Sequence, residues 1–282
     1  MEKYIRHEDL INFNKATYDN GIESLELSSL EQFIDVVKIF NVAKDYYIWR
    51  GQRKDWQLIS KFDRGNYGKG FVKLFERNEM INRLIKKFKS HLIEIQDMEP
   101  PSPDFNSLKN DAILGIGQHN GLITPLLDWT EDPYVAAYFA FYEKDINQEC
   151  DRVIYALNKD LQSYIHVLKI KNANKEVISK EKTPFVRFLD LKGIKLDKRI
   201  ERQRGLFTQS LDGLDVKENV LNYIKKHPQK NNEIILAKIF IPNKFQGKSL
   251  KFLRDNNITH GYLFPDYAGA VEICEIDMGL DI

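Results

Sequence analysis

The spacing of apolar residues changes part-way along the chain, and this change constrains the fold more than any other feature. Between residues 28 and 140 apolar positions recur mostly at helical intervals, most clearly in 71–97. From residue 152 onward the chain instead contains short β-prone runs, at 153–157, 185–189, 205–209, 234–240 and 271–276. Helices that precede strands predict an α+β fold, with helices of the N-terminal half packed on a mostly antiparallel sheet.

Local signals place the individual elements. Ser28 with Glu31 fits a capping box that opens a helix, and Pro133 after Asp132 begins another. We also expect a strand at 46–51. Further helices are predicted at 107–118 and 246–255, a short extension at 56–59, and loops at 171–182 and 225–232. Residues 1–25 are predicted to be an irregular arm, and residues 26–282 a single domain.

Composition excludes several classes of protein. The 282 residues are 43% hydrophobic and 29% charged, which is typical of a globular protein with a real core. A formal net charge of +1 gives no global cationic field for nucleic acid. No apolar run could span a membrane, and the N-terminal residues do not resemble a signal peptide. We therefore expect a cytoplasmic protein in which Cys150 and Cys274 are reduced thiols.

The first candidate segment for chemistry is Trp49-Arg50-Gly51-Gln52, at the end of a predicted strand. An arginine there offers a rigid fork of donors that fits a pyrophosphate or a carboxylate. The glycine lets a ligand approach the backbone closely. The alternative is that Arg50 only forms an internal ion pair.

The second candidate segment runs from Gln118 to Thr130 and is dense in polar and aromatic groups. A helix end, a glycine and then an extended run should bring Gln118, His119, Asp128 and Thr130 near one another. His119 could titrate near neutral pH or donate hydrogen bonds. The alternative is that Asp128 caps the next helix and His119 is a buried structural histidine.

The third candidate segment is 202–208, where Arg202, Gln203 and Arg204 precede a glycine and a strand. The alternative is a basic surface loop. Elsewhere, the six histidines show no paired ligand spacing, so we expect no metal site. The chain also lacks the glycine-rich phosphate loops and the nucleophile elbow of common enzyme classes.

Taken in order, these segments resemble the FRG family. The opening motif is Tyr47 to Gln52 with Trp56 to Leu58, and a helix at 76–88 follows. The central signature is 118–122 with 126–130 and 133–140. The segment 202–207 and a closing segment around 258–269 are similar to the later motifs. The family commonly has an arginine where Pro125 stands, so another cation, such as Arg53 or Arg202, would have to replace it.

The resemblance implies a distant relationship to the ADP-ribosyltransferases, with their split sheet and with NAD as substrate. It implies catalytic roles for Arg50, His119, Asp128, Thr130 and Gln203. Cofactor-binding roles would fall to Trp49, Gly51, Gln52, Gln118, Trp129 and Glu201. Arg50 would grip phosphate, His119 and Thr130 would orient the nicotinamide ribose, and Asp128 or Glu201 would supply negative charge. Gln203 stands where a transferase normally has glutamate, and an amide stabilises an oxocarbenium-like state less well than a carboxylate.

Three function classes remain open at this stage. The first is an NAD-consuming enzyme, such as a bacterial toxin or antiphage effector, that modifies a protein or nucleic acid and is held by an antitoxin or chaperone. The second is a catalytically silent nucleotide-binding module. The third is a nucleic-acid-binding protein, which is favoured only by the cluster Arg50, Arg53, Lys54, Lys61 and Arg64.

Overall fold

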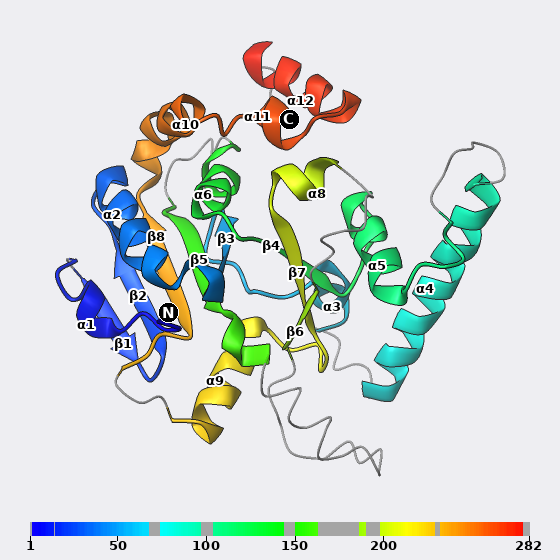
Figure 1. Cartoon of the computed structure of the whole chain (residues 1–282), viewed down its shortest axis with the longest axis horizontal. Helices are drawn as coiled ribbons and strands as arrows, with labels where there is room; N and C mark the ends of the chain where they lie inside the picture. Colours follow the sequence, from blue (N-terminus) through cyan, green and yellow to red (C-terminus); the bar gives the residue numbers. More distant parts are fainter. Residues whose placement is uncertain are drawn as a thin grey trace.

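In the computed structural model, one mixed sheet forms the centre of the molecule (Figure 1). The structure describes residues 2–13, 15–67, 74–96, 104–143, 150–162, 186–189, 198–228 and 232–278. The strand order is β1-β2-β8-β5-β3-β4-β7-β6, and only the β2–β8 pair is parallel among the strands described. The strands are β1 (Ala16–Asp19), β2 (Ile22–Glu26), β3 (Tyr47–Gln52), β4 (Leu126–Thr130), β5 (Arg152–Asn158), β6 (Val186–Leu189), β7 (Gly205–Ser210) and β8 (Leu236–Ile241).

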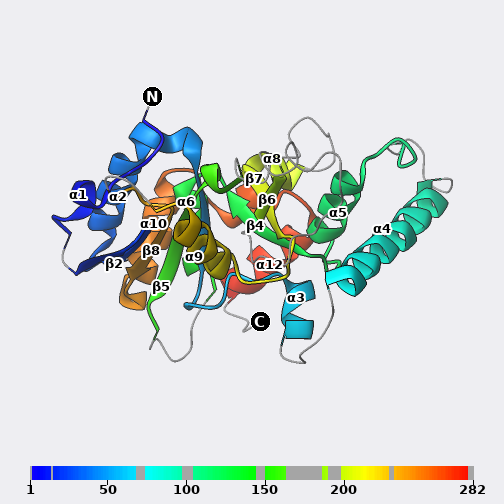
Figure 2. The same ribbon diagram turned by 90° about the horizontal axis from the view of Figure 1, so that it is seen from below.

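Helices cover both faces of this sheet (Figures 1 and 2). The α-helices are α1 (His7–Leu10), α2 (Leu30–Phe40), α3 (Lys61–Tyr67), α4 (Leu74–Gln96), α5 (Asn110–His119), α6 (Pro133–Phe141), α8 (Lys198–Arg202), α9 (Val216–Lys226), α10 (Gln246–Asp255), α11 (His260–Leu263) and α12 (Tyr267–Met278). Short 3-10 turns occupy Asn41–Tyr46, Lys159–Gln162 and Asn243–Phe245. No helix in the described ranges is long and apolar enough to cross a membrane.

Apolar side chains form separate cores on the two faces. On one face, α2, α6 and α10 pack over β3, β5 and β8 in a cluster that includes Trp49, Ala156 and Ala237. On the same face, α4 and α5 pack against Leu126 of β4 and Phe207 of β7 in a second cluster. The opposite face is covered by α9. The first face therefore has two apolar clusters, one on each side of the place where β3 meets β4.

The sheet is nearly split at that point. Strands β3 and β4 share only the antiparallel pair Trp49–Thr130 among the residues described. By contrast, β3 is paired with β5 along its whole length, from Tyr47 to Gln52. Residues 50–52 therefore lack a partner strand on their β4 side, and this gap is where the candidate site lies.

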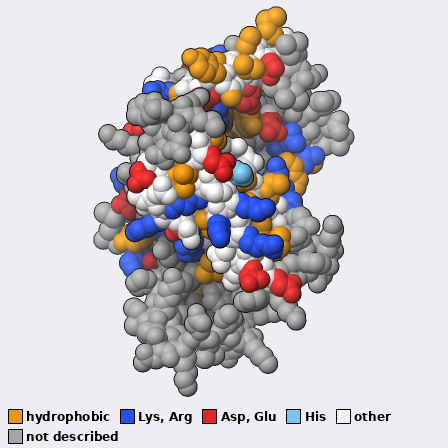
Figure 3. Space-filling view, turned by 90° about the vertical axis from the view of Figure 1, so that its right-hand side faces the viewer, with side chains coloured by type: hydrophobic (Ala, Val, Ile, Leu, Met, Phe, Trp, Pro, Cys, Tyr) orange, Lys and Arg blue, Asp and Glu red, His pale blue; other side chains and the backbone are white. Residues whose placement is uncertain are grey.

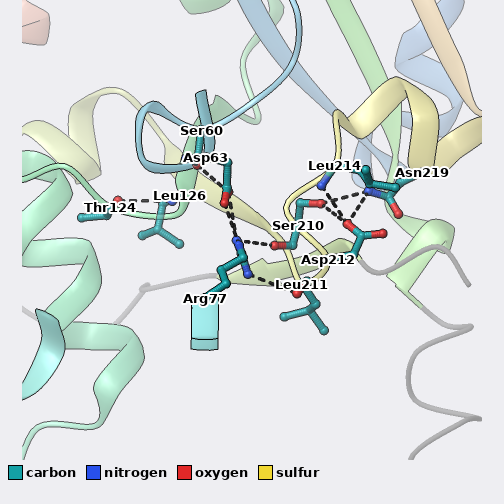
Figure 4. Close-up of polar contacts among 10 residues, drawn as sticks. All are labelled: Ser60, Asp63, Arg77, Thr124, Leu126, Ser210, Leu211, Asp212, Leu214 and Asn219. Carbon is teal, nitrogen blue, oxygen red and sulfur yellow. Dashed lines mark hydrogen bonds and ion pairs between the residues drawn. The ribbon is translucent and has the colours of Figure 1, made fainter. Parts of the chain in front are cut away.

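A buried ion pair anchors the α4 end of the molecule to the sheet (Figure 4). Arg77 of α4 forms a bidentate pair with Asp63 of α3, with distances of 2.6 and 2.9 Å. The same guanidinium donates to the backbone carbonyls of Ser210 and Leu211, at the end of β7. Because α4 and α5 pack together, this anchor also helps to position the end of α5, which contributes to the site.

Most predicted elements are confirmed. The structure has the strands at 47–52, 152–158, 205–210 and 236–241, and helices over 74–96, 110–119, 133–141 and 246–255. The strand at 186–189 is also present. The predicted loop at 171–182 lies outside the described residues. Cys150 and Cys274 are both unpaired thiols.

Other predictions were wrong. The stretch predicted as an irregular arm contains α1 and the strands β1 and β2, with Ile5 and Leu10 in the core. The strand that pairs with β2 on its inner side, β8, lies more than 200 residues away, so the local pattern did not reveal the pairing. The position of a domain boundary near residue 25 stays a prediction.

Local capping explains two further differences. Helix α2 is capped by Ser29, whose hydroxyl accepts from the Gln32 N–H, and not by Ser28 with Glu31. The run 271–276 is part of helix α12 and not a strand. The Asp266 side chain accepts from the Gly269 N–H, which favours a helix start there, and a six-residue apolar pattern alone cannot separate helix from strand.

The order of elements also differs from the prediction. Strands β1 to β4 lie in the N-terminal half and helices α9 to α12 in the C-terminal half, so helices and strands alternate more than expected. Residues 53–60 contain no strand, and α9 was not predicted. The α+β class and the mostly antiparallel sheet are nevertheless confirmed.

Candidate active site

A pocket of about 390 Å³ opens where β3 and β4 separate. Its walls come from β3, the loop after it, the end of α5, β4, one side of α6, α8 and the segment after α11. The lining residues are Trp49, Arg50, Gly51, Gln52, Arg53, Trp56, Gln118, His119, Asp128, Trp129, Thr130, Ala136, Phe139, Tyr142, Glu143, Arg199, Gln203 and Phe264. The size is that of an ordinary small-molecule site.

The close approach of α6 to β3 depends on Gly51. A Cβ at this position would lie 1.8 Å from the carbonyl oxygen of Ala136 and 2.7 Å from the backbone nitrogen of Ala140. The helix can lie this close only because β3 has no side chain there. Asp132 caps α6 by accepting from the N–H groups of Tyr134 and Val135, so the alternative in which Asp128 caps this helix is wrong.

Arg50 bridges the two separating strands. Its Nη1 donates to the backbone carbonyl of Asp128 at 2.7 Å and lies 3.9 Å from the Asp128 Oδ2. The Nε is buried and has no hydrogen-bond partner among the described residues. Burial lowers the pKa of Arg50, while the nearby Asp128 charge acts in the opposite direction. The guanidinium nevertheless remains a cation at any physiological pH.

The Asp128 carboxylate is oriented by Gln118. The Gln118 side-chain nitrogen donates to both carboxylate oxygens, at 3.2 and 3.0 Å. The Gln118 carbonyl in turn accepts from the Thr124 hydroxyl, which fixes the direction of the amide. The predicted proximity of Gln118, His119, Asp128 and Thr130 is confirmed, since all four line the pocket.

Thr130 and Trp129 are already bound within the protein. The Thr130 hydroxyl donates to the backbone carbonyl of Gln203 at 2.6 Å and accepts from the Asp132 N–H at 3.0 Å. The indole N–H of Trp129 donates to the Thr208 hydroxyl at 2.8 Å. These bonds hold β4, α6 and the start of β7 together. Both residues therefore shape the pocket more than they offer free polar groups to a ligand.

Gln203 of the third segment and the neighbouring Glu201 were both expected at the site, but only Gln203 lines the pocket. Gln203 lines the pocket, and its side-chain nitrogen donates to the carbonyl of Leu263 at 3.1 Å. Glu201 is exposed and is not part of the pocket wall. The structure thus does not bring Glu201 to the site. Arg202 also points elsewhere, donating to the Tyr262 carbonyl at 3.2 Å.

Glu143 is a pocket carboxylate that sequence reasoning missed. Its Oε2 lies 2.8 Å from Arg53 Nη1, and its Oε1 accepts from the Tyr142 hydroxyl at 3.0 Å. Arg53 also lies over the Trp56 ring, 5.5 Å from its centroid. The sequence offered one indication of this role, which is that Glu143 lies just after the last turn of α6. Phe139 and Tyr142, from the same region, also line the pocket.

Arg199 and Phe264 also line the pocket. The Arg199 guanidinium is paired with Asp266 and lies 5.2 Å from the centroid of the Phe264 ring. The Arg199 side chain lowers the pKa of Asp266 to about 2. In total the lining contains three arginines, two carboxylates and several aromatic rings. Such a wall suits a ligand with negative charge and a flat ring system.

The arginine that the family commonly has at Pro125 is not replaced beside Asp128 by Arg53 or Arg202, although Arg53 lines the pocket. Arg50 itself is the cation beside Asp128, while Arg53 is paired with Glu143.

Away from the pocket, exposed residues of α4 include Arg83, Lys86 and Lys87. Figure 3 shows a band of Lys and Arg side chains across this end of the molecule, with Asp and Glu side chains on either side of it.

Comparison with known proteins identifies the part of the chain that carries the site. Residues 45–149 match the family model of the FRG domain. The chain contains an FRG domain. The matched part of this FRG domain includes β3, α5, β4 and α6, and thus supplies Arg50, Gln118, Asp128 and Glu143. Gln203, Arg199 and Phe264 come from the chain that follows it. No curated protein and no solved structure matches the chain.

Proposed function

We propose that this FRG domain binds NAD and cleaves the bond between its nicotinamide and ribose, transferring ADP-ribose to an acceptor. The observation that carries the proposal is the arrangement of Arg50 and Asp128 in one pocket. A partly buried cation and an oriented carboxylate lie on either side of the gap between β3 and β4. The near-split sheet agrees with the resemblance of the family to the ADP-ribosyltransferases.

Each part of the ligand has a matching part of the pocket. The pyrophosphate carries negative charges that Arg50 can contact through its fork of donors, including the unpartnered Nε. The aromatic walls formed by Trp56, Tyr142 and Phe264 suit stacking of a flat ring. The Asp128 carboxylate, held by Gln118, is the group that can stabilise positive charge on the ribose.

The reaction balances with the groups present. The glycosidic bond breaks, and its electron pair leaves with the nicotinamide nitrogen, which becomes neutral. The ribose carbon then carries positive charge, which a nearby carboxylate stabilises. A nucleophile of the acceptor forms the new bond and loses a proton. Asp128 is our candidate for the stabilising charge, with Glu143 as the second pocket carboxylate, because Glu201 lies outside the wall.

The test is calorimetric titration of NAD into the purified protein, followed by mass analysis of released nicotinamide. We expect binding and slow release by the wild type. The variant Arg50→Ala should lose binding, while Arg254→Ala, at an exposed position on α10, should keep it. Absence of NAD binding by the folded wild type would discard the proposal. Binding without release in the presence of a cell extract as acceptor source would favour the silent nucleotide-binding alternative.

We further propose that the protein is a bacterial toxin or antiphage effector that acts in the cytoplasm under the control of an antitoxin or chaperone. The support is the resemblance to a family with members in such modules. Induced expression of the wild type in a bacterium should slow growth, and Asp128→Asn should restore it. Equal growth of the two cultures at equal protein levels would contradict this role.

A further inference from the structure

The side chain of Gln52 is buried, and its oxygen has no hydrogen-bond partner in the described part of the chain. It is the last residue of β3, its exposed fraction is 5%, and it lines the pocket. The side-chain oxygen is shielded from solvent and makes no hydrogen bond with any residue that the structure describes. The other amides of the pocket differ, because Gln118 and Gln203 are both bonded within the protein.

Such a group is costly for the folded protein. A buried polar atom without a hydrogen bond destabilises the folded state, and nearly all buried polar groups therefore have partners. A leucine at position 52 would avoid this cost because it carries no polar group. Gln52 destabilises the free protein and lies in the wall of a pocket. Its presence there is best explained if a bound ligand supplies the missing partner.

The chemistry of the missing partner follows from the amide itself. A glutamine side chain offers one acceptor and one donor in a single plane, and its terminal torsion turns with little restriction. Its complement is a planar group that also has a donor beside an acceptor, such as a carboxamide. A carboxylate has acceptors only, so it would face the glutamine oxygen with no bond and with repulsion.

The position of Gln52 relates this group to Arg50. Alternate residues of a strand project on the same side, and two residues span about 7 Å. Arg50 and Gln52 thus project on the same side of β3. Their cross-strand neighbours on β5 are Tyr155 and Val153, respectively. A ligand whose phosphate reaches Arg50 and whose planar amide lies one sugar away can contact both residues.

We propose that Gln52 reads the carboxamide of the ligand and makes the pocket select an amide over the corresponding carboxylate. This inference rests on the proposed function, since it assigns the nicotinamide end of the dinucleotide to Gln52. It makes Gln52 a specificity-determining residue for the ligand.

The experiment compares NAD with nicotinic acid adenine dinucleotide, which differs only by a carboxylate in place of the carboxamide. Both are titrated into the wild type, Gln52→Leu, Gln52→Ala and the control Gln57→Ala, whose side chain is exposed and outside the pocket wall. We expect the wild type and Gln57→Ala to prefer NAD by 10-fold or more, on the order of one to two paired hydrogen bonds. Both Gln52 variants should lose most of this preference.

Thermal unfolding of the same proteins separates ligand recognition from a structural role. Gln52→Leu should melt at or above the wild-type temperature, because it removes the buried oxygen that has no partner among the described residues. Retention of the preference in both Gln52 variants, or a wild type that binds the two dinucleotides equally, would overturn the inference while leaving the proposed function in place. A wild type that binds neither dinucleotide would overturn the proposed function, and the inference with it.

Discussion

Arg50 donates from Nη1 to the backbone carbonyl of Asp128 at 2.7 Å, across the point where β3 and β4 stop pairing. The bond links two segments that are 78 residues apart in the chain. It connects the strands where the backbone ladder no longer does. The same guanidinium is thus both a structural link and the main cation of the pocket.

We therefore expect Arg50→Lys to weaken both the link between the strands and the binding of NAD. A lysine keeps the charge but lacks the fork that can bond a carbonyl and a phosphate together. Affinity for NAD should fall by about 10-fold or more, and the free energy of unfolding by about 1–2 kcal/mol. Calorimetric titration and urea unfolding measure the two quantities. Unchanged affinity in Arg50→Lys would show that the pocket uses Arg50 as a point charge only.

Gly51→Ala tests the close contact between β3 and α6. Because the new Cβ would overlap the Ala136 carbonyl and the Ala140 nitrogen, which are backbone atoms, helix and strand must move apart. We expect a loss of stability of about 3 kcal/mol or more.

Gly247→Ala is the matched control for this change. A Cβ at this exposed position of α10 meets no atom within 4 Å, so we expect a gain of about 0.5–1 kcal/mol. Urea unfolding curves of the two variants provide the comparison. Similar stabilities of the two variants would contradict the close packing of α6 on β3.

Arg77→Ala tests the anchor that connects α4 to the sheet. The guanidinium is 7% exposed and its partner Asp63 is 5% exposed, so the change leaves a buried carboxylate without its cation. We expect a loss of about 3–5 kcal/mol. Arg83→Ala, at an exposed position on the same helix, should change stability by less than about 0.5 kcal/mol. Thermal unfolding of the two variants checks the difference, and equal melting temperatures would contradict the anchor.

Glu23 should make stability depend on pH. Its side chain is fully buried in β2, and one oxygen lies 2.9 Å from Nδ1 of His7. Burial raises the pKa of Glu23 to about 7, although His7 acts in the opposite direction. Below pH 4.5 the carboxyl is protonated in both the folded and the unfolded chain. Between pH 4.5 and about 7 only the unfolded chain ionises, so stability falls as the pH rises.

The expected loss across this range is on the order of 3 kcal/mol. Glu23→Gln cannot ionise, so its stability should lack this fall and should exceed that of the wild type above pH 7. Urea unfolding at about pH 5, 6 and 7.5 measures the difference. Parallel pH profiles of the two proteins would show that Glu23 is not the group responsible.

Much of the candidate site was predictable because its parts are local. The strand that ends at Arg50, Gly51 and Gln52 has a strong β pattern, and it forms as predicted. Gln118 and Asp128 meet because only a short turn lies between the end of α5 and β4. Asp132 and Pro133 together specify where α6 begins. In each case the conformation depends on residues close together in the chain.

The tertiary structure alone decided which distant groups join these local elements. Arg199 and Phe264 reach the pocket from parts of the chain that no short pattern connects to β3, whereas Glu201, two residues from Arg199, does not. The pairing of β2 with β8 likewise depends on contacts far along the sequence. A sequence pattern determines how a segment bends and which side is apolar. Which partner satisfies its hydrogen bonds, and which buried amide is left without one, is decided only when the whole chain packs.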